Sequence, residues 1–170
     1  MAKKNFKQLL KNVKAFAFDI DGVFTDCKIL VVPGDDLPRA MSVRDGYAVK
    51  HAVGNGYKMV IISGGRSEAG KTRLERLGAH KVYIGRDDKL NALKEFMNEH
   101  NLKFENILYM GDDMPDYEVM QKAGVPCCPK DAVPEIKDLS VYISDKKGGD
   151  GCVRDVIEQV MKIHGKWLKK

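Results

Sequence analysis

The sequence predicts an α/β fold of the Rossmann-like kind, with a parallel sheet covered by helices on both faces. Apolar runs of strand length recur along the chain. Between several of these runs, apolar residues recur three or four positions apart, which is the spacing of an amphipathic helix. A chain of 170 residues with 44% hydrophobic residues can bury one substantial core. We therefore expect a single domain over residues 1–170.

Each element follows from its local pattern. The predicted strands, in chain order, are residues 13–20, 57–64, 81–85, 106–111 and 141–144. Because these runs are apolar almost throughout, they are typical of parallel strands that are buried on both faces. The predicted helices are residues 46–53, 68–77, 89–101, 116–123 and 151–168. In the third of these helices, Leu90, Leu93 and Met97 share one face.

One stretch departs from the alternation of strands and helices. Residues 28–43 contain two short runs, KILVV and RAMSV, on either side of the turn-forming sequence PGDDLP. This pattern predicts a β-hairpin inserted after the first strand. The hairpin offers an edge or a protruding surface.

The charge distribution argues against a nucleic-acid partner. The formal net charge is +5, but residues 1–14 hold five lysines and residues 161–170 hold four, with no acidic residue in either stretch. The body between them is mildly acidic, whereas a nucleic-acid binder needs a basic face. Apolar runs near the first residue are short and broken by lysines, so neither a signal peptide nor a membrane span is expected. Four cysteines without CxxC spacing are expected to be reduced, and we predict a cytoplasmic location.

Polar side chains follow three of the predicted strands. Asp19 and Asp21 follow the first strand, Ser63 follows the second, and Asp112 and Asp113 follow the fourth. Since ligands bind beyond the carboxyl ends of parallel strands, these groups are expected to meet at one rim. Several carboxylates would repel one another there unless they shared a cation, and oxygen ligands suit Mg²⁺. One ionised aspartate could then attack a phosphorus centre, and a second could act as a general acid and base.

Four motifs in this order, FDIDGVFTD, IISGG, DDKL and GDDMPD, resemble the haloacid dehalogenase superfamily of aspartate-nucleophile phosphotransferases. The resemblance implies that Asp19 is the nucleophile and that Asp21 is the general acid and base. It implies a Mg²⁺ site made by Asp19, Asp112 and the backbone carbonyl of Asp21. The resemblance further implies that the phosphoryl group is held by Ser63, Gly64 and Lys89, of which Lys89 is also catalytic. It implies that Asp113 and Asp116 support the metal and the lysine.

Further stretches, VRDGYAVKHA, DDKLNAL and GGDGCVRDVIE, resemble a cap-less branch of this superfamily. Its members hydrolyse the 8-phosphate of an eight-carbon keto sugar acid in the synthesis of a lipopolysaccharide precursor. This resemblance implies that there is no cap domain, that the chain forms a homotetramer through its hairpins, and that a neighbouring subunit closes each active site. Residues 148–151 and Arg154 match the segment of the family at that closure.

The residues that bind the sugar acid are less well defined, because this branch has an arginine where the chain has Gly65. Three other arginines, Arg66, Arg73 and Arg86, could replace it. Arg44 and Asp45 match a family element that faces the sugar acid. These residues, together with Arg154, are the candidate substrate-binding residues.

Other interpretations stay open. A phosphatase for the 9-phosphate of a nine-carbon keto sugar acid shares the same core motifs, and the same fold could serve as a catalytically silent oligomerisation module. Taken one at a time, the acidic residues could be turn or helix-start residues, and Ser63 could cap the following helix. Neither a GxGxxG nor a GxxxxGK[ST] motif occurs, which disfavours dinucleotide binding and P-loop hydrolysis.

Overall fold

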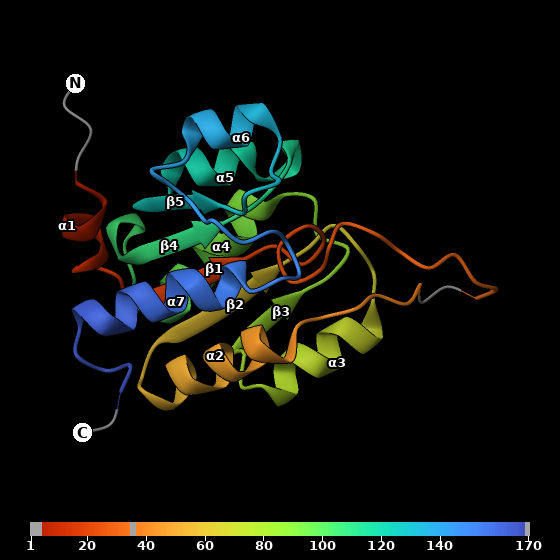
Figure 1. Cartoon of the computed structure of the whole chain (residues 1–170), viewed down its shortest axis with the longest axis horizontal. Coiled ribbons are helices and arrows are strands. Elements are labelled where there is room, and N and C mark those ends of the chain that lie inside the picture. Colours follow the sequence, from red (N-terminus) through yellow and green to blue (C-terminus); the bar gives the residue numbers. More distant parts are fainter. Residues whose placement is uncertain (1–4, 35–36, 169–170) are drawn as a thin grey trace.

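A six-stranded parallel sheet forms the centre of the protein (Figure 1). The computed structural model describes residues 5–34 and 37–168. The strands are β1 (Ala15–Phe18), β2 (Lys58–Ile62), β3 (Lys81–Tyr83), β4 (Ile107–Met110), β5 (Val125–Cys128) and β6 (Tyr142–Ile143). Their order across the sheet is β3-β2-β1-β4-β5-β6, and all neighbours are parallel. The strand order therefore switches direction between β1 and β4, which is where this kind of sheet leaves a ligand-binding crevice.

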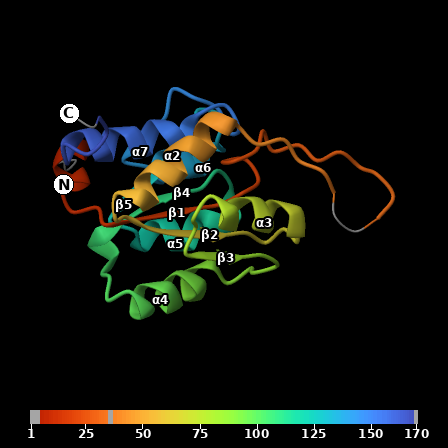
Figure 2. The ribbon, with the colours of Figure 1, turned by 90° about the horizontal axis from the view of Figure 1, so that it is seen from below.

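Helices cover both faces of the sheet (Figures 1 and 2). One face carries α1 (Phe6–Leu10), α2 (Val43–Gly54), α3 (Glu68–Arg76) and α7 (Cys152–Ile163), and the other carries α4 (Lys89–Glu99), α5 (Tyr117–Lys122) and α6 (Pro134–Leu139). Single-turn 3₁₀ helices, η1 (Phe104–Asn106) and η2 (Met114–Asp116), flank β4. Alternate residues of β1 enter the two cores, Phe16 and Phe18 on the first face and Ala15 and Ala17 on the second. In the described ranges, no helix is long and apolar enough to cross a bilayer.

The predicted fold class is confirmed, with differences in individual elements. All five predicted strands are present, but β5 was not predicted. Its sequence, VPCC, contains Pro126, which lacks a backbone N–H and normally argues against a central strand. The helices α1 and α6 were also not predicted, because each is too short to show a helical period. The last helix ends at Ile163, before the predicted end at residue 168.

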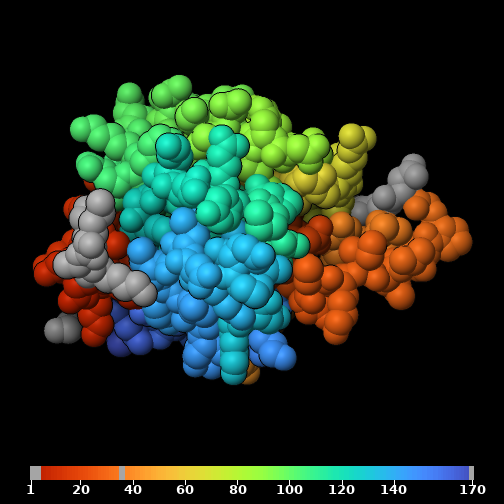
Figure 3. Space-filling model, turned by 90° about the horizontal axis from the view of Figure 1, so that it is seen from above, coloured from red at the N-terminus to blue at the C-terminus, as the bar shows by residue number. Residues whose placement is uncertain are grey.

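Residues 27–34 and 37–42, here called the protruding segment, leave the body as an extended arm (Figures 2 and 3). The β-strands predicted for this hairpin are absent from its described residues, 27–34 and 37–42. Among these described residues, a backbone hydrogen bond from Leu30 N–H to the Pro38 carbonyl, at 3.0 Å, joins the two sides of the arm. A two-stranded ribbon with no third strand and no core to cover is marginal in water, which explains the loop. The apolar side chains of Ile29, Leu30 and Val31 are exposed.

Candidate active site

A cavity of about 380 Å³ lies at the carboxyl ends of β1, β2 and β4. The topology explains its position, since β1 and β4 are the neighbours between which the strand order switches. The structure brings most of the predicted site residues to this cavity. It is lined by Asp19, Asp21, Cys27, Ser63, Gly64, Gly65, Asp87, Lys89, Asp112, Asp113 and Pro115.

A buried lysine joins two of the acidic residues at the base of the cavity. Lys89 is the first residue of α4 and only 3% of its surface is exposed. Its Nζ lies 3.0 Å from Asp19 Oδ2 and 2.8 Å from Asp116 Oδ1. Because a lysine is rarely buried without partners, these two carboxylates account for its position.

Asp116 lies beneath the cavity, is completely buried and has both of its oxygens in use. Oδ1 accepts hydrogen bonds from Lys89 and, at 2.8 Å, from the hydroxyl of Tyr109. Oδ2 accepts one from the backbone N–H of Asp112 at 3.2 Å. A Cβ on Gly111 would clash with the Asp116 carboxyl group, so glycine is needed where β4 gives way to the site. Asp116 thus positions both Lys89 and the backbone of Asp112.

The site holds more negative charge than its lysine balances. Burial and the charge of Asp116 raise the pKa of Asp19 to about 8, although the charge and hydrogen bond of Lys89 oppose the rise. Burial, together with Asp116 and Asp113, raises the pKa of Asp112 to about 7. Burial disfavours the charged form of Lys89, yet Asp19 and Asp116 hold the pKa of Lys89 above its ordinary value. An added cation would relieve the repulsion among these carboxylates.

The acidic residues fit a hard divalent cation. Asp19, Asp112 and Asp116 can each offer one oxygen such that all three atoms lie within 4.8 Å of one another. Carboxylate oxygens are the ligands that Mg²⁺ prefers. Since Asp116 is already fully hydrogen-bonded, Asp19 and Asp112 are the better candidates for direct ligands. Asp113 is exposed at the rim, where its side chain accepts a hydrogen bond from Met114 N–H at 2.7 Å.

Ser63 directly follows β2 and is 2% exposed. Its hydroxyl accepts a hydrogen bond from the backbone N–H of Gly65 at 3.1 Å. The residue that caps α3 is Ser67, which accepts from Gly70 N–H at 3.1 Å. Capping of the helix therefore does not account for Ser63, and its hydroxyl belongs to the cavity.

Two glycines near the start of α7 support the loop that follows β1. Gly149 donates its N–H to the carbonyl of Val23 at 2.9 Å. A Cβ on Gly148 would clash with the carbonyl of Gly22. Gly22 has a φ of +86°, and a Cβ there would clash with the Asp112 carboxylate. Gly148 and Gly149 thus pack closely against the loop of their own chain. The role of residues 148–151 and Arg154 in closing the active site of a neighbouring subunit stays a prediction.

The candidate substrate-binding residues do not line the carboxylate cavity. Asp45 is fully buried, and its Oδ1 accepts the backbone N–H of Arg154, near the start of α7, at 2.8 Å. The Arg154 guanidinium lies over the rings of Tyr47 and Trp167, at 5.8 and 5.3 Å. Arg44 and Arg154 line a separate hollow of about 420 Å³. Within the single chain, α2 thus packs the Asp45 side chain against α7. The contact of Asp45 with the sugar acid stays a prediction.

The three arginines considered as replacements at Gly65 also lie elsewhere. Arg66 is exposed beside Gly85. Arg86 is paired with Glu95 at 2.6 Å and with Asp88. Arg73 lines another hollow, described below.

An arginine that sequence reasoning missed does reach the site. Arg39, from the protruding segment, donates from Nε to Asp21 Oδ1 at 2.6 Å and from Nη2 to Asp21 Oδ2 at 3.1 Å. Only 11% of the Arg39 side chain is exposed. Nothing in the sequence places this residue, because its segment has no periodic pattern that sets the direction of its side chains.

Comparison with known proteins defines the class. Residues 77–156 match the haloacid dehalogenase-like hydrolase family. This match, the relatives given below, the cavity at the strand-order switch and the lack of any inserted domain in the described residues define a cap-less haloacid dehalogenase-like hydrolase.

Relatives define the family more narrowly. The 3-deoxy-D-manno-octulosonate 8-phosphate phosphatases of Salmonella typhi and Escherichia coli K12 are each 31% identical over 92% of this chain and 83% of their own length. The crystal structure of the Moraxella catarrhalis enzyme, in complex with magnesium, phosphate and a KDO molecule, has a TM-score of 0.91 at 30% identity and covers 95% of this chain and 93% of that one. The cobalt-bound Haemophilus influenzae enzyme has a TM-score of 0.90 at 26% identity, with 94% of each chain covered. The chain belongs to the family of 3-deoxy-D-manno-octulosonate 8-phosphate phosphatases.

Proposed function

We propose that this protein is a Mg²⁺-dependent phosphatase that hydrolyses 3-deoxy-D-manno-octulosonate 8-phosphate to the free sugar acid and phosphate, in lipopolysaccharide precursor synthesis. The observation that carries the proposal is the buried cluster in which Lys89 bridges Asp19 and Asp116 beside Asp112. Relatives over nearly the whole chain carry the same activity in their names. The cytoplasm, where such a precursor is made, is the proposed location.

In the first half of the reaction, a carboxylate oxygen of Asp19 attacks the phosphorus atom. The bond between phosphorus and the sugar oxygen breaks, and Asp21 donates a proton to the departing oxygen. The Ser63 hydroxyl, the Gly64 backbone and Lys89 hold the phosphoryl oxygens, which carry the charge in the transition state. The product of this half is the free sugar acid and an aspartyl-phosphate on Asp19.

In the second half, water replaces the sugar. Asp21 accepts a proton from a water molecule, whose oxygen attacks the same phosphorus atom, and the bond to the Asp19 oxygen breaks. Phosphate leaves and Asp19 returns to its carboxylate form. Asp113 and Asp116 act indirectly, Asp113 at the rim of the cavity and Asp116 by holding Lys89 and the backbone of Asp112.

Asp19 and Asp112 would hold the Mg²⁺ ion through their side chains, with the backbone carbonyl of Asp21 as a further ligand. When bound, the ion neutralises negative charge on the carboxylates and on the phosphoryl group. The chemistry of the donors supports this assignment, since the cluster has three buried carboxylates and one lysine.

The assembly is part of the proposal. A homotetramer built through the protruding segments would cover the exposed side chains of Ile29, Leu30 and Val31, and a neighbouring subunit would then close each cavity. The variant Leu30→Asp is expected to sediment as a smaller species and to lose activity, whereas Lys28→Ala, on the same segment, keeps both. A Leu30→Asp monomer with full activity would contradict closure by a neighbour.

A phosphate-release screen tests the proposed function. The protein should release phosphate from the eight-carbon keto sugar acid 8-phosphate with Mg²⁺ and not after chelation. Faster turnover of a nine-carbon keto sugar acid 9-phosphate would favour the alternative substrate. Metal-dependent release from neither substrate, nor from any other sugar phosphate, would favour a catalytically silent oligomerisation module.

A further inference from the structure

We infer that Arg39 is a positioning residue for Asp21, and that the absence of a side chain at Gly65 makes room for it. The inference rests on the proposed function, because it concerns the residue proposed to transfer protons. If the inference holds, the protruding segment contributes to the reaction of its own chain, independently of any role in assembly.

The contact between Arg39 and Asp21 has the geometry of a fork. Nε and Nη2 of the guanidinium each donate to a different oxygen of the carboxylate, at 2.6 and 3.1 Å. Two parallel hydrogen bonds of this kind fix the plane of a carboxylate as well as its position. A single ammonium group would fix only the distance.

The arginine is itself held in place. Its Nη1 donates to the carbonyl of Leu37, two residues earlier, at 2.7 Å. Only 11% of the Arg39 side chain is exposed, against 33% for Asp21. Ordinary surface ion pairs contribute little because both partners remain solvated and mobile. In this pair the arginine side chain is largely shielded from solvent, so we expect the ion pair to persist in solution.

Gly65 is the neighbour that permits the contact. A Cβ at residue 65 would lie 3.0 Å from Asp21 Oδ2 and 3.3 Å from Arg39 Nη2. Both distances, like the 3.3 Å to Ser63 Oγ, are tighter than an ordinary van der Waals contact, so a side chain here would crowd the ion pair and the Ser63 hydroxyl. The Arg39 guanidinium therefore approaches, from the protruding segment, the place where a Cβ at residue 65 would lie.

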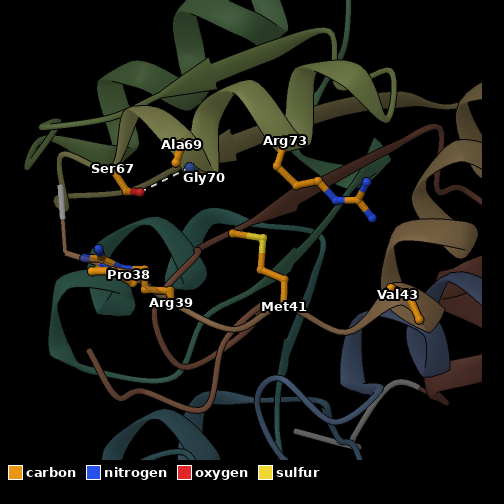
Figure 4. Close-up of a pocket in the computed structure, with 8 residues that line it drawn as sticks. All are labelled: Pro38, Arg39, Met41, Val43, Ser67, Ala69, Gly70 and Arg73. Carbon is orange, nitrogen blue, oxygen red and sulfur yellow. Dashed lines mark hydrogen bonds between the residues drawn. The ribbon is translucent and has the colours of Figure 1, made fainter. Parts of the chain in front are cut away.

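Arg39 lines a second hollow and, through Asp21, contacts the wall of the carboxylate cavity. Beyond the carboxylate cavity lies a second hollow of about 570 Å³, lined by Pro38, Arg39, Met41, Val43, Ser67, Ala69, Gly70 and Arg73. In Figure 4, Arg73 extends from α3 on one side of this hollow and Arg39 lies on the other, with Met41 between them. If the protruding segment moved, Arg39 would leave Asp21. The orientation of the Asp21 carboxyl group therefore depends on the position of this segment.

Kinetics with two leaving groups can test the inference. The value of kcat/KM reports the steps up to release of the leaving group. A departing sugar oxygen needs a proton from Asp21, whereas p-nitrophenolate is stable enough to leave almost without one. Arg39→Ala should lower kcat/KM for the sugar acid phosphate about tenfold to a hundredfold, the usual scale for a residue that orients a site group. For p-nitrophenyl phosphate the loss should stay below about threefold, and Arg39→Lys should recover part of the activity with the sugar acid phosphate.

A double-mutant cycle separates positioning from direct binding of substrate. If Arg39 acts through Asp21, adding Arg39→Ala to Asp21→Asn should change kcat/KM less than about twofold for either ester. An equal loss in both backgrounds would overturn the inference, because Arg39 would then bind the substrate itself. Gly65→Ala should resemble Arg39→Ala and add little to it. Lys28→Ala, which removes a cation from the same segment, is the matched control and should leave kcat/KM unchanged.

A second readout does not depend on turnover. The Nε–H resonance of Arg39, observed by nuclear magnetic resonance, should be protected from exchange in the wild-type protein and lose that protection in Asp21→Asn. An unprotected resonance in the wild type would overturn the inference even in an active enzyme. Protection in a protein that hydrolyses no phosphate ester would instead overturn the proposed function and the positioning role, while still showing the ion pair.

Discussion

Two buried aspartates, Asp19 and Asp45, differ in a way that separates a functional site from a structural one. Burial raises the pKa of both, Asp19 to about 8 and Asp45 to about 6. Asp19 lines a cavity and shares Lys89 with another buried carboxylate. Asp45 lines no such cavity and accepts a hydrogen bond from the start of α7. A buried carboxylate alone therefore does not indicate chemistry, whereas several around one lysine at the strand ends do.

The position of Asp45 has a structural explanation. The N-terminus of α7 carries unpaired backbone N–H groups and the positive end of the helix dipole, and the carboxylate of Asp45 lies against both. Its second oxygen, Oδ2, is buried and has no hydrogen-bond partner among the described residues. The same residue type therefore serves as a cap on one side of the sheet and as a proposed nucleophile at its edge.

The largest effect is expected for Asp19→Asn. Turnover should fall by about four orders of magnitude or more, the scale seen when a nucleophile is removed. The fold should persist, because the amide has nearly the same volume and removes one of several repelling charges. Phosphate release and thermal unfolding, measured on the same preparation, test both parts. Retained turnover would refute the assignment of the nucleophile.

Among these variants, removal of Lys89 should lower the free energy of unfolding the most. Lys89→Met leaves Asp19 and Asp116 buried without a cation, which costs about 3–5 kcal/mol in comparable buried pairs. Urea unfolding at neutral pH measures the loss. The double variant Lys89→Met with Asp116→Asn should recover part of the stability, since it buries one charge fewer. Equal stability of Lys89→Met and the wild type would show that the lysine does not balance this cluster.

In contrast to Asp19, Asp45 should affect the stability of the protein and not its turnover. Asp45→Ala removes the cap of α7 and should lower the free energy of unfolding by about 1–2 kcal/mol. Because Asp45 does not line the carboxylate cavity, kcat should change less than about twofold. Asp45→Asn keeps an acceptor for the Arg154 N–H and is the matched control. A loss of kcat without a loss of stability would place Asp45 in the reaction.

The smallest expected effect is the dependence of the free energy of unfolding on pH. The pKa of Asp45 rises from 3.8 to about 6 on folding, so its carboxyl group favours the folded state at low pH, and this contribution is lost as the pH rises through 6. The stability of the wild type relative to Asp45→Asn should therefore decline from pH 4 to pH 7, by at most about 3 kcal/mol for a shift of this size. Urea unfolding of both proteins across this range is the measurement. A difference in stability that grows with pH would contradict a pKa of Asp45 that burial raises.

The fold and the centre of the site were largely predictable from the sequence, for identifiable reasons. Apolar runs define β1, β2 and β4, and Asp19, Ser63 and Asp112 follow these strands, so the parallel topology alone brings them to one rim. By contrast, β5 was hidden because Pro126 argues against a central strand.

Residues outside the sheet edge could not be placed in this way. Arg39 reaches Asp21 from an irregular segment, and no local pattern encodes the direction of such a segment. The packing of α2 on α7 brings the Asp45 carboxylate to the backbone N–H of Arg154, a contact that no motif predicted. Long-range packing of helices and loops thus determined what the motifs alone did not.

The central claim is that Asp19 becomes transiently phosphorylated in a site that needs a divalent cation. Acid quenching during turnover of the sugar acid phosphate, followed by mass spectrometry of the peptide that contains Asp19, tests it directly. A phosphoryl group is expected on Asp19 that forms with Mg²⁺, decays as substrate is exhausted and is absent from Asp112→Asn. Turnover with no phosphoryl group on Asp19, or with one on another residue, would contradict it.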